Sequence, residues 1–226
     1  MKKLNLVIGL AGVLGASAAL ANGSVKGTIS YAGPPVKAEM LKRKGDAFCA
    51  KKDFADETVQ LSKDGKALAN VLVRITNPPA GMKAPPEPVV VDQEDCMYRP
   101  RVQGAVEGQK IEFKNSDQTM HNVHAFSGTK TLFNAPQQPK AAPMDKDAKA
   151  TDVVKLQCDV HPWMRGYVVY GKSPLFAVSK ADGTFEIKDV PAGKYTLEAW
   201  HEKLGSQKID VTVEDNKPVD PKITFK

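Results

Sequence analysis

Short runs of alternating apolar and polar residues follow one another from Ser24 to the end of the chain, and turn residues separate them. Alternation with a period of two is typical of β-strands that bury one face. No stretch repeats apolar residues at the spacing of a long helix. The chain is therefore predicted to be all-β. The strands are expected at residues 25–31, 69–76, 89–91, 102–105, 110–114, 122–126, 153–157, 167–170, 176–179, 185–187, 195–199, 209–213 and 223–225.

The N-terminus has the three parts of an export signal. Residues 1–3 are basic, residues 4–20 are apolar, and Ala19 to Ala21 have the A-x-A form of a cleavage site. A membrane anchor is the alternative, but Gly and Ser interrupt the apolar run and a small-residue site follows it. We therefore expect residues 1–21 to be a signal peptide that is cleaved after Ala21. The mature protein is then periplasmic and has no membrane span, because no other apolar run is long enough to cross a bilayer.

The charge balance argues against a nucleic-acid partner. Lys and Arg number 32 and Asp and Glu 26, so the formal net charge is +6. Cleavage of the leader removes Lys2 and Lys3 and lowers this value by two. The remaining lysines are scattered and form no dense basic block, which is typical of a solvated surface. They favour an acidic partner only weakly.

Composition divides the mature chain into three parts. Residues 77–88 are rich in Pro, Ala and Gly and are predicted to be a linker. We expect an N-terminal β segment at residues 22–86, a middle domain at 87–171 and a C-terminal β segment at 172–226. Within the middle domain, the polar residues 137–152 are expected to form a mobile loop.

The C-terminal segment resembles carboxypeptidase regulatory-like domains, which are small transthyretin-like β-sandwiches. The resemblance lies in residues 179–197, where turns at Asp182-Gly183 and Pro191-Ala192-Gly193 flank alternating strands. Such a domain normally begins with a G-T-[VI] strand and an A-x-V-x-V strand. Residues 27–29 and 69–73 supply these patterns, so the resemblance implies one sandwich built from both ends of the chain. Two independent β pieces that flank the middle domain are the alternative.

One short turn gathers three metal-binding side chains. Cys158, His161 and Met164 have the spacing C-x2-H-x2-M and follow a predicted strand. His121 follows a turn-rich stretch upstream and offers a second imidazole. A thiolate, two imidazoles and a weakly held thioether are the donors of a blue-copper site, because sulfur suits Cu(I) and imidazole suits both oxidation states. Each residue alone is more typical of a core or a turn, and only the combination predicts copper.

The stretch around His121 and the stretch from Cys158 to Met164 resemble cupredoxins, most closely the amicyanins, and the resemblance covers residues 88–171. The resemblance implies a Greek-key β-sandwich with one type 1 copper ion held by the four residues just named. It assigns Asn122 to bracing the ligand loop and leaves His124 outside the ligand set. It also implies that the loop histidine reaches the surface through an apolar patch, here Pro162 and Trp163, where electrons pass. The large flanking segments depart from that family.

An odd number of cysteines in an exported protein leaves one thiol over. We expect a disulfide between Cys49 and Cys96, which the oxidising compartment favours, and a metal-bound thiolate at Cys158. Free thiols at Cys49 and Cys96 are the alternative.

The predicted function is one-electron transfer by a mononuclear blue-copper protein. The family resemblance implies redox partners such as a c-type cytochrome or a dehydrogenase. A copper-delivery protein with the same ligands is one alternative, and a β-sandwich surface module with a vestigial copper site is another. An enzyme is not expected, because four histidines do not suffice for a second copper centre of the usual type. Gln157 and Asp159 flank Cys158 where copper oxidases typically have a histidine, and no Rossmann, P-loop or catalytic-triad motif is present.

Overall fold

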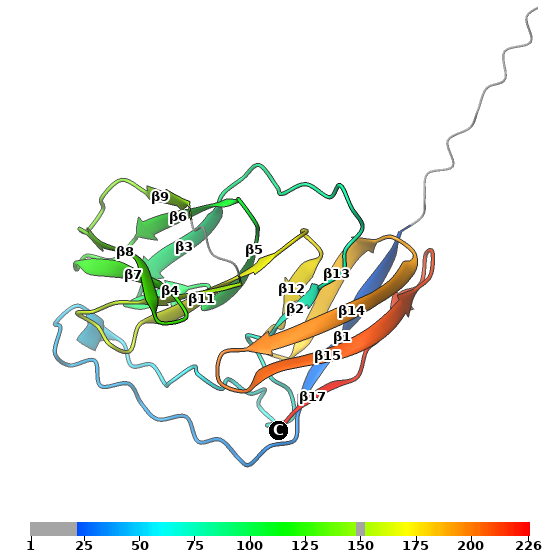
Figure 1. Cartoon of the computed structure of the whole chain (residues 1–226). Helices are drawn as coiled ribbons and strands as arrows, with labels where there is room; N and C mark the ends of the chain where they lie inside the picture. The colour runs from blue at the N-terminus through cyan, green and yellow to red at the C-terminus, as the bar shows by residue number, and fades with distance from the viewer. Residues whose placement is uncertain (1–21, 148–151) are drawn as a thin grey trace, which may run out of the picture.

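The computed structural model describes residues 22–147 and 152–226, and the predicted signal peptide lies outside them. Two β-sandwiches lie side by side, with the chain entering and leaving through the same one (Figure 1). The all-β prediction is confirmed, since the helical element of the described residues is the single-turn 3-10 helix η1, Cys49–Lys51. Within the described ranges, no helix is long and apolar enough to cross a membrane.

The terminal sandwich combines strands from both ends of the chain. One sheet has the order β13-β1-β16, with β17 also paired to β1, and the other has the order β12-β2-β14-β15. The N-terminal strand β1 pairs antiparallel with β13 and parallel with β16 and β17. The bounds are β1 Gly23–Tyr31, β2 Leu72–Ile75, β12 Phe176–Val178, β13 Thr184–Val190, β14 Gly193–His201, β15 Gly205–Val213, β16 Pro218–Val219 and β17 Ile223–Phe225.

Alternation along these strands builds the core of the terminal sandwich. Val25 and Ile29 of β1 and Leu197 of β14 are completely buried, and they belong to one apolar cluster that draws on both sheets. Burying such a side chain contributes about 1.5–3 kcal/mol relative to leaving it exposed. The period-two pattern therefore holds the two sheets face to face.

The middle sandwich is formed by residues 89–171. One sheet has the order β5-β11-β10-β7-β8 and the other β4-β3-β6-β9. Completely buried apolar residues of both sheets, such as Phe113 of β6 and Leu156 of β10, share one core. The bounds are β3 Val89–Glu94, β4 Met97–Arg99, β5 Val102–Val106, β6 Lys110–Asn115, β7 His121–Ser127, β8 Lys130–Gln137, β9 Met144–Asp147, β10 Val153–Gln157 and β11 Arg165–Gly171.

The predicted loop at residues 137–152 is wrong at Gln137, which ends β8, and at residues 144–147, while residues 148–151 lie outside the described residues. Residues 144–147 form β9, which pairs antiparallel with β6 at the edge of its sheet. Its sequence, MDKD, has one apolar residue, Met144, which packs against the core, and backbone hydrogen bonds to one neighbour hold the rest of this edge strand. Periodicity therefore carries no signal for this strand.

Apolar and charged contacts join the two sandwiches. A small apolar cluster contains Leu72 from the terminal sandwich and Val102 and Val169 from the middle one. Arg101 and Glu202 form an ion pair with a 2.5 Å contact across the junction, and both side chains are 4% exposed. A buried charge of this kind depends on its partner, because removing one partner leaves the other uncompensated.

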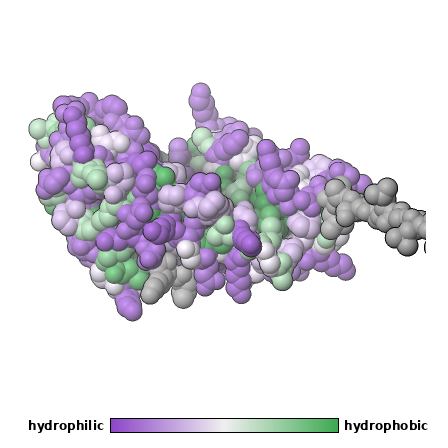
Figure 2. Space-filling model, turned by 90° about the horizontal axis from the view of Figure 1, so that it is seen from above, coloured by the Kyte–Doolittle hydropathy of each residue, from purple (hydrophilic) through white to green (hydrophobic). Residues whose placement is uncertain are grey.

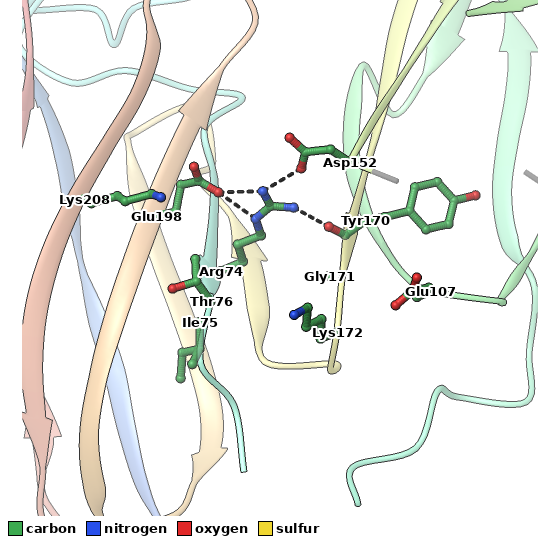
Figure 3. Close-up of a pocket in the computed structure, with 10 residues that line it drawn as sticks. All are labelled: Arg74, Ile75, Thr76, Glu107, Asp152, Tyr170, Gly171, Lys172, Glu198 and Lys208. Atoms are coloured by element: carbon green, nitrogen blue, oxygen red, sulfur yellow. Dashed lines mark hydrogen bonds and ion pairs between the residues drawn. The ribbon is translucent and has the colours of Figure 1, made fainter. Parts of the chain in front are cut away.

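Arg74 of β2 makes a second set of contacts across the junction (Figure 3). Its guanidinium donates to the carboxylate of Glu198 at 2.5 Å, to the carboxylate of Asp152 at 2.6 Å and to the backbone carbonyl of Tyr170. Glu198 belongs to the terminal sandwich, whereas Asp152 and Tyr170 belong to the middle one. These residues line a pocket between the two sandwiches, and Arg74, Asp152 and Glu198 are engaged there in holding the sandwiches together.

The connection from β1 to β2 leaves the terminal sandwich, crosses to the middle one and returns (Figure 1). Its farthest part is residues 41–54, here called the strap. The N–H of Leu41 donates to the carbonyl of Phe54 at 2.8 Å and closes the base of the strap. Near its tip, a disulfide joins Cys49 of η1 to Cys96, between β3 and β4. The strap is therefore covalently attached to the middle sandwich.

Candidate metal centre

The loop between β10 and β11 carries Cys158, His161 and Met164 at one end of the middle sandwich. Cys158 directly follows β10, and Met164 directly precedes β11. The N–H of Cys158 donates to the carbonyl of Met164 at 3.3 Å, and the N–H of Met164 donates to the carbonyl of His161 at 2.9 Å. These bonds close the loop into a tight turn and keep the three side chains in one region.

His121 reaches this loop through the pairing of β7 with β10. The two strands are antiparallel, with His124 opposite Gln157, so the first residue of β7 lies beyond the end of β10. The Nδ1 atoms of His121 and His161 are 2.9 Å apart, and Sγ of Cys158 is 3.8 Å from Nδ1 of His161. Each of the three residues has a donor atom within 4.8 Å of the donors of the other two.

Donor atoms at these separations fit a single metal ion. Bonds of about 2.0 Å from nitrogen and about 2.3 Å from sulfur place the donors of one ion roughly 3–4 Å apart. The side chains of His121 and Cys158 are completely buried and His161 is 4% exposed. Met164 is also completely buried, in the same apolar core as Cys158. One thiolate with two imidazoles beside a thioether is a donor set that suits copper better than harder ions.

Two further groups of potential ligands occur among the described residues. One contains Asp46, Cys49 and His161, and the other contains Cys96, Asp117 and His121. The sulfurs of Cys49 and Cys96 are joined to each other, so neither is a thiolate ligand. Cys158 is a free thiol, so the group that contains it can supply a thiolate ligand.

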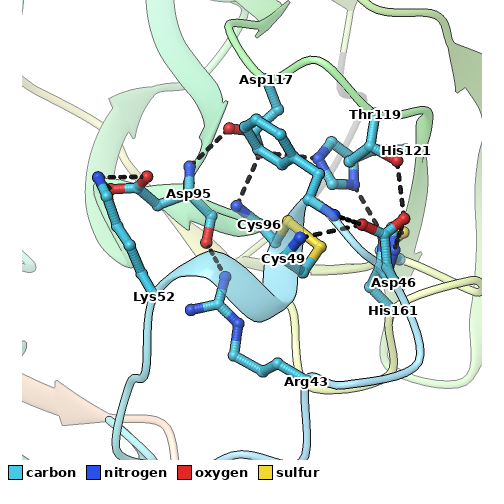
Figure 4. Close-up of a disulfide and its surroundings, with 12 residues drawn as sticks. Arg43, Asp46, Cys49, Lys52, Asp95, Cys96, Asp117, Thr119, His121 and His161 are labelled. Atoms are coloured by element: carbon cyan, nitrogen blue, oxygen red, sulfur yellow. Dashed lines mark hydrogen bonds and ion pairs between the residues drawn. A yellow bond between two sulfur atoms is a disulfide. The ribbon is translucent and has the colours of Figure 1, made fainter.

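Each imidazole has a carboxylate beside its outer nitrogen, and neither carboxylate was predicted from the sequence. Nε2–H of His121 donates to the carboxylate of Asp117 at 2.8 Å, and Nε2 of His161 lies 3.5 Å from the carboxylate of Asp46 (Figure 4). A carboxylate on the outer nitrogen fixes the tautomer, orients the ring and leaves Nδ1 free for a metal. Asp117 stands in the turn just before β7, which is a weak signal, whereas nothing in the sequence pointed to Asp46.

Asn122 connects β7 to the loop that carries the thiol. Its Oδ1 accepts a hydrogen bond from the N–H of Asp159 at 2.7 Å and lies 3.3 Å from Sγ of Cys158. Its Nδ2 donates to the carboxylate of Asp159 at 2.9 Å. The side chain therefore holds the residue after the thiol in place, which is a bracing contact. His124, by contrast, contacts Asp159 and Thr131 and is absent from the donor group.

We expect Asn122→Ala to lower the free energy of unfolding of the metal-free protein by about 1–3 kcal/mol, because the N–H of Asp159 loses its acceptor in a partly buried hydrogen bond. Denaturant unfolding measures the change. Asn134→Ala is a matched control, since exposed Asn134 donates to the same carboxylate and its loss should cost less than about 0.5 kcal/mol. Equal effects of the two substitutions would contradict the bracing role of Asn122.

The hydrogen bonds around Cys158 favour its thiolate. Burial raises the pKa of Cys158, but hydrogen bonds with His121 and His161 and with backbone N–H groups together lower that pKa from 9.0 to about 6. The pKa of His121 is raised, because its contacts with Asp117 and Cys158 outweigh burial. A thiolate is the form of cysteine that binds metal. The site therefore presents its sulfur in the ligand form at neutral pH.

The ultraviolet thiolate absorbance of the metal-free protein should rise with a midpoint at about pH 6. Because the folded-state pKa is depressed, the stability contributed by Cys158 is full above about pH 9 and is lost as the pH falls to about 6. Cys158→Ser supplies the baseline, since the other two cysteines form the disulfide. A midpoint near pH 9 in the folded protein would contradict the arrangement of donors around the thiol.

His161 differs from the expectation that the loop histidine reaches the surface. Its side chain is 5% exposed, because Asp46 of the strap lies against Nε2. Pro162 is exposed, whereas Trp163 is half-buried, packs on the His161 ring at 5.1 Å between centroids, and donates from Nε1 to the carbonyl of Cys96 at 3.0 Å. The pattern of the copper loop alone does not reveal a distant segment that covers it.

A match to a known family covers less than a third of the chain. Residues 158–225 match the β-sandwich domain of ER membrane protein complex subunit 7. The match supports the predicted β-sandwich, and it names a different family from the carboxypeptidase regulatory-like domains that this segment resembles. No curated protein matches the chain significantly.

Solved structures of copper proteins resemble parts of the chain. A purple cupredoxin from Nitrosopumilus maritimus is 21% identical and matches 37% of this chain and 99% of its own, with a TM-score of 0.33. A Cu-containing nitrite reductase from Thermus scotoductus is 23% identical over 42% of this chain and 25% of its own, with a TM-score of 0.34. A methionine-to-alanine mutant of amicyanin in the Cu(I) form is 23% identical over 43% of this chain and 97% of its own, with a TM-score of 0.33. Because these scores are low, the site has to be judged by its own geometry.

Proposed function

We propose that the protein is an exported, mononuclear blue-copper electron carrier with a cupredoxin-like middle sandwich. The observation that carries the proposal is the convergence of Sγ of Cys158 with Nδ1 of His121 and of His161, each within 4.8 Å of the other two. Met164 would supply a weak fourth contact from the same buried core. A bound copper ion would supply one-electron chemistry by alternating between Cu(II) and Cu(I).

The residues around the donors support rapid electron transfer by limiting movement. The two imidazoles are held from behind by Asp117 and Asp46, and the loop is tied by Asn122. Burial of all four donor side chains would keep water away from a bound ion. Because Cu(I) and Cu(II) prefer different surroundings, ligands held between the two preferences need little rearrangement when an electron moves. We assign no catalytic role to the site.

Burial also favours a carrier over a copper-delivery protein, which was the alternative from the sequence. An ion that is handed to another protein has to be reached by incoming ligands. Here the donor residues are buried, and the strap covers the outer nitrogen of His161. We further propose that the N-terminal leader exports the protein to the periplasm. Its redox partner there is a c-type cytochrome or a dehydrogenase.

Retention of copper separates these two functions. Metal-free protein should take up one equivalent of Cu(II), and the copper content should stay at one per chain after repeated reduction by ascorbate and reoxidation by ferricyanide in the presence of a Cu(I) chelator. Loss of most copper to the chelator in the first reduced state would instead favour delivery. Uptake without any thiolate-to-copper visible absorption would favour a vestigial site in a surface module.

A further inference from the structure

The strap occupies the position at which the loop histidine would otherwise face solvent. Asp46 turns inward, where its carboxylate accepts hydrogen bonds from Thr119 Oγ1 at 2.8 Å and from the N–H groups of Phe48 and Cys49 at 2.8 and 2.9 Å, and it faces His161. A redox partner that approaches this end of the molecule therefore meets the strap.

The outward side of the strap is basic. The strap has two acidic residues: Asp46, which is turned inward, and Asp53, which is exposed. Lys42, Lys44 and Lys51 are exposed, and none of them forms an ion pair with the described residues. Among the described residues these three lysines have no carboxylate partner, and Lys51 lies 4.9 Å from the centre of the Phe48 ring.

The strap is fixed in place, so this charge is presented rigidly. Besides the disulfide, Arg43 donates to the backbone carbonyl of Asp95, and Lys52 pairs with the Asp95 carboxylate at 2.6 Å (Figure 4). Arg43 is buried and stacks over the Phe54 ring at 4.7 Å. A surface anchored in this way loses little conformational freedom when a partner binds.

The charged surface lies next to the metal centre. Lys44 stands two residues before Asp46, which contacts His161, and Lys51 stands two residues after Cys49, whose sulfur lies within 4.8 Å of a His161 nitrogen. Leu41, beside Lys42, lines a small cavity together with Pro162 of the metal loop. The face in Figure 2 is largely hydrophilic, and its apolar residues gather in a few small areas.

We propose that the strap is the docking surface for an acidic redox protein, which is attracted by Lys42, Lys44 and Lys51 and exchanges electrons with the centre beneath them. The inference rests on the proposed function and gives it a partner of defined chemistry. Opposite charges across an interface raise the rate of encounter and align the partners, and salt screens the effect. The covered His161 is then reached through the strap instead of through an exposed apolar patch.

The first test measures carboxylate binding in the metal-free full chain. The triple variant Lys42→Glu, Lys44→Glu, Lys51→Glu should elute from a carboxymethyl cation-exchange column at clearly lower salt than the control triple variant Lys63→Glu, Lys180→Glu, Lys194→Glu. The control lysines are exposed, lie in the terminal sandwich and form no ion pair with the described residues. The two variants have the same net charge, so equal elution would overturn the proposal.

The second test follows oxidation of the Cu(I) protein by stopped-flow spectroscopy. At low salt, the strap variant should react with anionic ferricyanide at least about tenfold more slowly than the unmodified protein, and the control variant less than about twofold more slowly. With a cationic cobalt–phenanthroline oxidant, the strap variant should react faster. Equal effects of the strap and control variants on both oxidants would overturn the proposal. Absence of a thiolate-to-copper band would refute the proposed function instead, and the column result would still report on the surface.

Discussion

The Cys158→Ser protein should lack the intense thiolate-to-copper absorption completely. This band requires a sulfur bonded directly to Cu(II), and Cys158 is the free thiol, placed 3.8 Å from Nδ1 of His161. Serine has nearly the same shape but a hydroxyl that stays protonated at neutral pH, so the two imidazoles would bind copper without that band. Visible spectra of the proteins with one equivalent of Cu(II) measure the effect.

Matched methionine variants complete this experiment. Met164→Leu should retain the thiolate band but shift it, because a weak axial contact adjusts the copper–sulfur bond without creating it. Met144→Leu, in β9 of the same sandwich, serves as the control and should leave the spectrum unchanged. A Cys158→Ser protein that keeps the full band would contradict the assignment of the thiolate.

Removing the disulfide should have the largest effect on stability. Cys49 and Cys96 are separated by 47 positions in the sequence, and closing a loop of that length restricts the unfolded chain by about 4 kcal/mol on the entropic estimate. The free energy of unfolding of the double variant Cys49→Ser, Cys96→Ser should therefore be lower by about 2–5 kcal/mol. Denaturant unfolding of the metal-free protein checks this value.

The same variant should also disturb the metal centre. The N–H groups of Asp95 and Cys96 both donate to the carboxylate of Asp117 at 2.7 Å, and that carboxylate holds His121. Lys52→Ala is the control, because its exposed ion pair with Asp95 should contribute less than about 1 kcal/mol. If the double serine variant were as stable as Lys52→Ala, with an unchanged visible spectrum, the strap would not support the centre.

Local sequence patterns were sufficient to predict most of the strands. Residues 153–157 alternate toward a buried core, and β10 has the predicted bounds because each change of side-chain polarity there coincides with a change of face. The edge strand β9 shows the limit of this signal. Its residues are held by pairing with β6 and gain little from burial, so no apolar period marks them.

The candidate ligands were predictable for a related reason. Cys158, His161 and Met164 lie on one turn, so their spacing directly expresses their proximity in space. His121 was named as a second imidazole from its place after a turn-rich stretch and from the family resemblance, whereas its approach to the loop depends on the pairing of β7 with β10. Asp46 is more than a hundred residues from His161 and is brought there by the strap and its disulfide. Proximity created by a long crossing connection leaves no local pattern in the sequence.

X-ray absorption at the copper edge tests the central claim most directly. In the full chain loaded with one equivalent of copper, the spectrum should show one short sulfur neighbour and two nitrogen neighbours, in agreement with Cys158, His121 and His161. Only nitrogen and oxygen neighbours, or two short sulfur neighbours, would contradict a centre built from one thiolate and two imidazoles.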